Sequence, residues 1–286
     1  MSKSQTTNLL LEVTSLCMSV AKKYVEAYSH RNSPQKFTQT QLLTLLVLRA
    51  YLKTTYRGVI EFVEVSEELR KRIGLTSLPH YSTLKKFADR SSVLEIVDAM
   101  LLELVQRFAA DEKEAAIDST GFETTSASAH FQTKTGRKRS KFVKVSVCVM
   151  ATSLIPSSVV LGWGPSNDKQ EAPELLAKAS NVNQPERLYG DAGYDADWVH
   201  QFCRETWNVE SVIKPAVHRS DGGLNGVYRP QMIDEYLKEK SYGRRWVVES
   251  FMSGLKRTTG AALNARSERS LFIEAALRVL AYAFRC

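Results

Sequence analysis

The chain has 286 residues, of which 43% are hydrophobic and 24% are charged, and its formal net charge is +8. These proportions are ordinary for a soluble globular protein, and the positive balance favours a polyanionic partner, either nucleic acid or an acidic membrane. The four cysteines are scattered without a CxxC pair and no HExxH occurs, which argues against a disulfide framework and against a zinc site.

The first residues, MSKSQTTNLLLEV, lack the long apolar core of a signal peptide. The most apolar stretch, LLTLLVLRAYL, is interrupted by Arg49 and is too short to cross a bilayer. We therefore expect a soluble, intracellular protein with no membrane partner.

Residues 1–110 are predicted to form an all-helical domain. Apolar residues recur there at spacings of three and four, over residues 9–28, 42–52, 59–69 and 93–108. Between the last two segments lies GLTSLPHYSTLKKFADR, in which Ser82 is a plausible N-cap for a short helix through Arg90. With Lys85 and Lys86 exposed, these short helices fit a DNA reader of the helix-turn-helix kind or, equally well, a simple helical packing domain.

Residues 111–286 are predicted to form a mixed α/β domain. Short apolar runs bounded by Gly, Pro, Ser and Asn indicate five strands: AAIDSTGF, KFVKVSVCVM, SSVVLGWG, RLYGDAGY and VESVIKP. Helical patterns follow over residues 170–179, over residues 196–206 and from residue 232 to the end. The order is β-β-β-α-β-α-β-α, so we expect three antiparallel strands and then two strands added in parallel through helices.

A basic run precedes the second predicted strand. Six cations and no carboxylate occur within residues 134–144, namely Lys134, Arg137, Lys138, Arg139, Lys141 and Lys144. Such runs are usually solvated loops. Anchored to a strand, this one is also a candidate for gripping the phosphate backbone of DNA.

Two of the predicted strands carry an aspartate near their end, Asp118 in the first and Asp191 in the fourth. The order of elements makes these two strands neighbours, so the two carboxylates are expected to meet, and Glu249 in the last helical segment is a third candidate. Carboxylates without histidine or thiol partners suit Mg²⁺ or Mn²⁺. Each aspartate is also a plausible turn residue.

Other acidic residues compete for the same role. They are Glu123, Asp168, Asp195 and Asp197.

The stretch YGRRWVVESFMSGLK has helix periodicity with two distinct faces. At about 100° per residue, Tyr242, Arg245, Glu249 and Lys256 share a stripe about 60° wide. The apolar residues fall on the opposite face, namely Val247, Val248, Phe251 and Leu255. The polar stripe suits a metal ligand flanked by phosphate contacts, and it also suits a solvent face with an i,i+4 ion pair.

These segments together resemble the DDE transposases of prokaryotic insertion sequences, in the group with a Y-x2-R-x3-E-x6-K signature. The spacing of the four stripe residues matches that signature, IDSTGF and YGDAGYD resemble the segments around the two family aspartates, and GLTSLPHYSTLKKF resembles the family's helical region. The resemblance implies a ribonuclease-H-like catalytic core over residues 111–286. It also implies two Mg²⁺ ions, replaceable by Mn²⁺, held by Asp118, Asp191 and Glu249.

The resemblance further implies an activity. Such a protein binds the terminal inverted repeats of its element in double-stranded DNA, cleaves phosphodiester bonds and joins the 3′-hydroxyl ends to target DNA, usually as a homodimer at the prokaryotic nucleoid. Tyr242, Arg245 and Lys256 would contact DNA near the cut, and the basic run with Lys85 and Lys86 would hold the backbone. A metal-dependent nuclease that does not join ends and a DNA-binding descendant without catalysis remain the alternatives. The short stretch after Pro215 leaves no room for the β-rich insertion of some family members, so the route of second-strand cleavage stays open.

Overall fold

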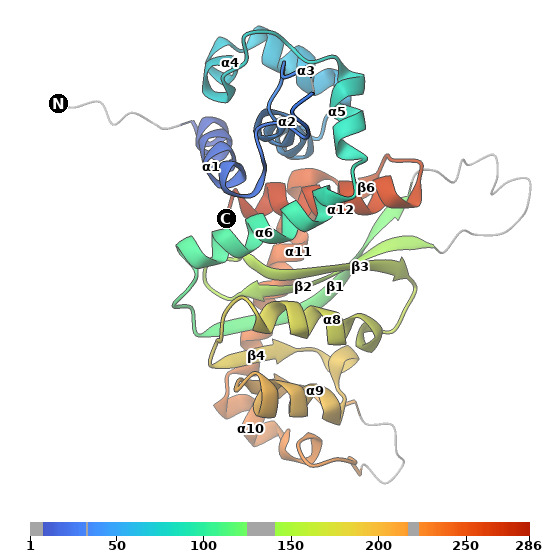
Figure 1. Ribbon diagram of the computed structural model, residues 1–286. Coiled ribbons are helices and arrows are strands. Elements are labelled where there is room, and N and C mark those ends of the chain that lie inside the picture. Colours follow the sequence, from blue (N-terminus) through green and yellow to red (C-terminus); the bar gives the residue numbers. More distant parts are fainter. Residues whose placement is uncertain (1–7, 33, 125–140, 217–222) are drawn as a thin grey trace, which may run out of the picture.

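The computed structural model describes residues 8–32, 34–124, 141–216 and 223–286 (Figure 1). The N-terminal part is helical, as predicted. Its helices are α1 (Leu9–Tyr24), α2 (Gln39–Tyr51), α3 (Tyr56–Val65), α4 (Glu67–Ile73), α5 (Tyr81–Ala88) and α6 (Ser92–Phe108). None of the described helices is both long enough and apolar enough to pass through a membrane.

Side-chain caps explain where two of these helices depart from the prediction. The helix expected over residues 59–69 is split, because the hydroxyl of Ser66 accepts a hydrogen bond from Leu69 N and starts α4. The helix expected to begin after Ser82 begins instead at Tyr81, since the ring of His80 accepts a hydrogen bond from Ser82 N. Thr38 and Gln41 form a capping box at the start of α2.

Five strands of the sheet have the topology that the sequence predicts, and a sixth, β6, was not predicted. Its strands are β1 (Glu114–Thr124), β2 (Phe142–Met150), β3 (Pro156–Gly164), β4 (Arg187–Gly190), β5 (Glu210–Ile213) and β6 (Ala262–Leu263). The order is β3-β2-β1-β4-β5, and β6 pairs with the far end of β1. The first three strands are antiparallel, whereas β4 and β5 add in parallel beside β1.

Helices cover both faces of the sheet. The helices of this part are α8 (Asp168–Ser180), α9 (Asp197–Gln201), α10 (Asp234–Glu239), α11 (Trp246–Thr259) and α12 (Glu268–Ala283). In Figure 1, α8 lies in front of β2 and β3, while α11 passes behind β1. The strands β1 and β2, which carry Asp118 and Lys144, therefore lie between α8 on one face of the sheet and α11 on the other.

The helix predicted from residue 232 to the end is broken into several pieces. A short 3-10 helix (Tyr242–Arg245) precedes α11, and β6 separates α11 from α12. The breaks fall at Ser241 and Gly260, both with positive φ (57° and 91°), a conformation that a continuous right-handed helix excludes.

The C-terminal helix α12 returns to the N-terminal helices and packs against α2 and α6 (Figure 1). A buried ion network crosses this contact, in which Arg278 donates to Glu274 at 2.9 Å and Arg49 lies 3.6 Å from the same carboxylate. The hydrophobic core is therefore continuous between the helices and the sheet. The domain boundary at residue 110 stays a prediction.

Candidate active site

Asp118 and Asp191 lie on neighbouring strands. Ile117 in β1 pairs with Gly190, the last residue of β4, and neighbouring strands are about 4.8 Å apart. Contrary to the prediction, Asp118 does not end its strand. β1 runs on to Thr124, but β4 stops at Gly190, so Asp118 lies just beyond the last residue pair that joins these two strands.

A backbone N–H holds one oxygen of each aspartate. Oδ1 of Asp118 accepts a hydrogen bond from Ser119 N at 2.7 Å, and Oδ1 of Asp191 accepts one from Gly193 N at 2.9 Å. The turn role foreseen for Asp191 is thus confirmed, because it caps the 3-10 helix Ala192–Tyr194, whereas Asp118 lies within β1 and not in a turn. Each backbone contact occupies only one carboxylate oxygen. Among the described residues, neither Oδ2 has a hydrogen-bond partner.

The surroundings of Asp118 disfavour its negative charge. Burial raises the pKa of its carboxyl to about 6, and the negative charges of Asp191 and Asp168 act in the same direction. The hydrogen bond from Ser119 N and the charge of Arg245 oppose this rise. A cation between these carboxylates would remove the penalty.

Replacing Asp118 with asparagine should therefore stabilise the metal-free protein at about pH 8. The shift from 3.8 to about 6 corresponds to about 1–3 kcal/mol at about 1.4 kcal/mol per pKa unit. Because the folded-state pKa is raised, the penalty is absent where both states are protonated and grows as the pH rises through 6. Thermal unfolding in EDTA should show melting temperatures that converge as the pH is lowered. An asparagine variant that melts no higher than the parent protein at about pH 8 would contradict this account.

Arg245 links Asp118 to α11. It forms an i,i+4 ion pair with Glu249, and although partial burial opposes its charge, Glu249, Tyr242 and Asp118 raise its pKa. Burial raises the pKa of the Tyr242 hydroxyl, Arg245 opposes that rise, and Asp191 adds to it. Arg245 is therefore close to Asp118 and Tyr242 is close to Asp191, whereas Glu249 is linked to them only through its ion pair with Arg245.

The amphipathic pattern predicted for α11 is confirmed on its apolar side, where Val247, Val248, Phe251 and Leu255 are all buried. The polar side differs, because Tyr242 and Arg245 belong to the 3-10 helix. The side chain of Glu249 is 53% exposed, and no three ligating side chains among the described residues gather into a ready-made metal site. Lys256, two turns further along, is partly exposed, and its side chain forms no hydrogen bond or ion pair in the described part of the chain.

Lys144 is buried, so it does not lie on the surface as the basic-run interpretation expected. Its side chain is 4% exposed, and Nζ lies 2.8 Å from both Asp168 Oδ1 and Glu171 Oε2. It also donates to the carbonyl and hydroxyl oxygens of Ser166 at 3.1 Å. The physical reason is its central place in the sheet, between β1 and β3 on the face that α8 covers.

Asp168 adjoins the two aspartates of the site. It accepts a hydrogen bond from Ser119 Oγ at 2.5 Å. A Cβ placed on Gly193 would lie 2.5 Å from Asp168 Oδ2 and 2.9 Å from Asp191 Oδ1, so a larger residue there would force one of these two carboxylates to move. From the sequence, Asp168 was only a competing carboxylate, because its distance from Asp191 along the chain gives no sign of this contact.

The other competing carboxylates have structural partners or lie apart. Asp195 is fully buried and ion-paired with Arg229 at 2.6 Å. Asp197 accepts hydrogen bonds from the backbone N–H groups of Val227 and Tyr228. Glu123 is exposed near the far end of β1.

The remaining predicted DNA contacts are only partly described. Lys141 is exposed with Nζ 3.9 Å from the centre of the Trp163 ring. Lys85 is ion-paired with Asp89, and Lys86 is exposed on α5. Four members of the basic run lie outside the described residues, namely Lys134, Arg137, Lys138 and Arg139.

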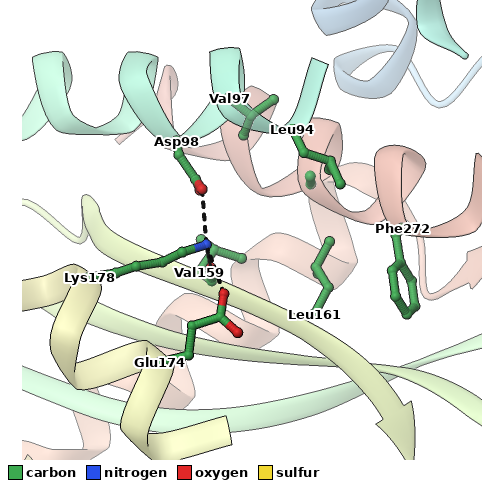
Figure 2. A pocket seen from close by; sticks show the side chains of 9 residues that line it. Leu94, Val97, Asp98, Val159, Leu161, Glu174, Lys178 and Phe272 are labelled. Atoms are coloured by element: carbon green, nitrogen blue, oxygen red, sulfur yellow. Dashed lines mark hydrogen bonds and ion pairs between the residues drawn. The ribbon is translucent and has the colours of Figure 1, made fainter. Parts of the chain in front are cut away.

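An apolar cavity lies between α6, β3 and α8, apart from the carboxylates (Figure 2). Val97, Leu161 and Phe272 line it, and an ion pair of 2.9 Å between Lys178 and Asp98 crosses it. Its two carboxylates, Asp98 and Glu174, both form ion pairs with Lys178 and lie apart from Asp118 and Asp191.

Comparison with known proteins identifies the family. The family described as "Transposase DDE domain" matches residues 109–284, so the chain belongs to the DDE transposases. No curated protein matches the chain. Among solved structures, it is similar to piggyBac transposase in a synaptic complex with hairpin DNA, with 8% identity, a TM-score of 0.49, and coverage of 98% of this chain and 72% of that chain.

Proposed function

We propose that the protein is the transposase of an insertion sequence. It binds the terminal inverted repeats of the element, cleaves phosphodiester bonds there and joins the 3′-hydroxyl ends to target DNA. The observation that supports this best is the adjacency of Asp118 and Asp191 on β1 and β4 with the Arg245–Glu249 pair beside them. That arrangement occurs in a chain of the DDE family, on a sheet with the strand order expected of a ribonuclease-H-like core.

The donor set fits divalent metal ions of the Mg²⁺ type. Asp118 and Asp191 each keep one carboxylate oxygen without a hydrogen bond among the described residues, and oxygen donors without histidine or thiol suit hard cations. Glu249 completes the set once its carboxylate leaves Arg245. When bound, a pair of Mg²⁺ or Mn²⁺ ions activates the attacking oxygen and stabilises the leaving oxygen.

The cations around this site are proposed to act in two ways, by stabilising charge at the reacting phosphate and by binding the DNA backbone. Arg245 and Lys256 meet charge on the phosphoryl oxygens, which is most effective when the groups are already in place. Tyr242 contacts DNA near the cut. Lys141 and the basic run before it supply affinity for the backbone without choosing a sequence, and residues 1–110 contribute further DNA contacts through Lys85 and Lys86.

The decisive experiment uses duplex DNA that carries an end of the element. Purified protein with Mg²⁺ should nick this DNA, and with a pre-cut end it should produce strand-transfer products in a target plasmid. Cleavage without joining would identify a nuclease instead, and binding without either would identify a non-catalytic descendant. Mg²⁺ should also raise the melting temperature of the parent protein but not that of the Asp118→Asn variant.

Variants on the two faces of α11 should behave in opposite ways. Arg245→Ala and Lys256→Ala should slow cleavage strongly with little loss of stability. The Arg245–Glu249 pair is partly solvated on its Glu249 side, such pairs contribute at most about 1 kcal/mol, and Lys256 forms no ion pair among the described residues. Phe251 is fully buried, so Phe251→Ala should lower the free energy of unfolding by about 3–5 kcal/mol. Melting temperature and Mg²⁺-dependent cleavage of all three variants test this pattern. If the first two cleave like the parent protein, the polar stripe is only a solvent face.

A further inference from the structure

A polar cavity opens where α2, α11 and α12 meet, and its charge is one-sided. The lining residues are Tyr51, Lys53, Gly254, Arg257, Thr258, Tyr282 and Arg285. No carboxylate is among them, and the three cationic residues are all exposed. Three positive charges therefore face one hollow with no acidic group in its described lining.

The cavity is built by contacts between distant parts of the chain. Lys53 has a positive φ of 51° directly after α2, and its ammonium donates to the carbonyl oxygen of Arg257. The ring of Tyr282 packs edge-on against Phe251 at 5.2 Å. A Cβ on Gly254 would lie 1.9 Å from the Tyr282 hydroxyl, so glycine lets that hydroxyl approach α11.

A neighbouring cavity also contains several cations, but there they form ion pairs within the protein. It shares Lys53 and is lined by Arg49 and Arg278, but Glu274 also lines it and pairs with both arginines. The positive charges of that cavity are neutralised within the protein. Those of Lys53, Arg257 and Arg285 have no such carboxylate partner among the described residues.

We propose that this cavity binds a backbone phosphate of DNA that extends from the cleavage site. The inference rests on the proposed function. Guanidinium groups match phosphate oxygens in shape and charge, and tyrosine hydroxyls can donate to the same oxygens. Glu249 and Arg257 lie on the same helix, and their separation in sequence corresponds to about 12 Å along the axis. That span is about three to four base pairs of duplex, so the cavity anchors DNA a short distance from the cut.

A triple variant tests the proposal against a charge-matched control. Lys53→Gln/Arg257→Gln/Arg285→Gln removes the three cations of the cavity. Lys22→Gln/Lys113→Gln/Lys238→Gln removes three exposed cations elsewhere. Fluorescence anisotropy with a labelled duplex, titrated with salt, measures affinity and its salt dependence, and thermal melting verifies the fold of each variant.

The cavity variant should bind at least about tenfold more weakly at about 0.1 M salt, with a log–log salt slope reduced by about 2.7 because each phosphate contact contributes about 0.9. Arg285→Gln alone should reduce the slope by about 0.9 and keeps the test valid if the triple variant folds poorly. Equal slopes for parent, cavity and control variants would overturn the proposal. Parent protein that binds DNA through this cavity without cleaving it would reject the proposed function alone, whereas a parent that binds no DNA would reject both.

Discussion

Replacing Asp118 or Asp191 with asparagine, or Glu249 with glutamine, should reduce DNA cleavage by at least about a thousandfold while leaving DNA binding largely intact. A missing transition-state contact alone costs about 10²–10³ in rate, and loss of a carboxylate also disables the metal pair that these residues are proposed to hold. Affinity for the backbone comes from the cations instead. Gel-shift and nicking assays on the same preparations measure both quantities.

The amide variants keep the shape of each side chain, so misfolding would not explain their inactivity. Asp118→Asn is expected to be more stable than the parent protein without metal, because the pKa of the Asp118 carboxyl is raised to about 6 by burial. Asp168→Asn is the matched control for Asp191→Asn, because Asp168 is a neighbouring carboxylate that adjoins Asp191 across Gly193. Substantial cleavage by the Asp191→Asn variant together with loss of cleavage by Asp168→Asn would transfer the catalytic role to Asp168.

Local sequence patterns were sufficient to predict the sheet. Alternating and apolar runs gave the five strands, and the helices between the last three strands required parallel addition beside β1. The extension of β1 to Thr124 was not predicted, because Glu123 and Thr124 lie beyond the run AAIDSTGF and show no apolar alternation. The break between Lys240 and α11 depends on a single positive φ at Ser241, which residue type does not indicate.

The candidate site was predictable where its residues lie in one helix or on strands whose adjacency follows from topology. Asp118, Asp191 and Arg245 met as expected for that reason. The cationic cavity was not predictable, since Lys53, Arg257 and Arg285 come together only through the packing of α12 on α2 and α11. The burial of Lys144 was missed because a charge in a basic run gives no local sign of carboxylates 24 and 27 residues away at Asp168 and Glu171.

Replacing Lys144 with methionine should destabilise the protein by about 3 kcal/mol. Breaking a buried ion pair by removing one partner costs about 3–5 kcal/mol, and the lower end applies because the side chain of Asp168 stays 27% exposed. Glu171, at 10% exposure, would lose its only cationic partner among the described residues. Urea unfolding of the two proteins measures the difference.

Lys141→Gln is the control for this prediction, because Lys141 belongs to the same basic run but is exposed. It should leave the free energy of unfolding nearly unchanged and should weaken DNA binding slightly, as loss of one phosphate contact does. Adding Glu171→Gln to Lys144→Met should restore part of the lost stability, since the second change removes a carboxylate that the first leaves without its cation. If Lys144→Met instead unfolds like the parent protein and binds DNA more weakly, its ammonium contacts the backbone, and the pairing with Asp168 and Glu171 is dispensable for folding.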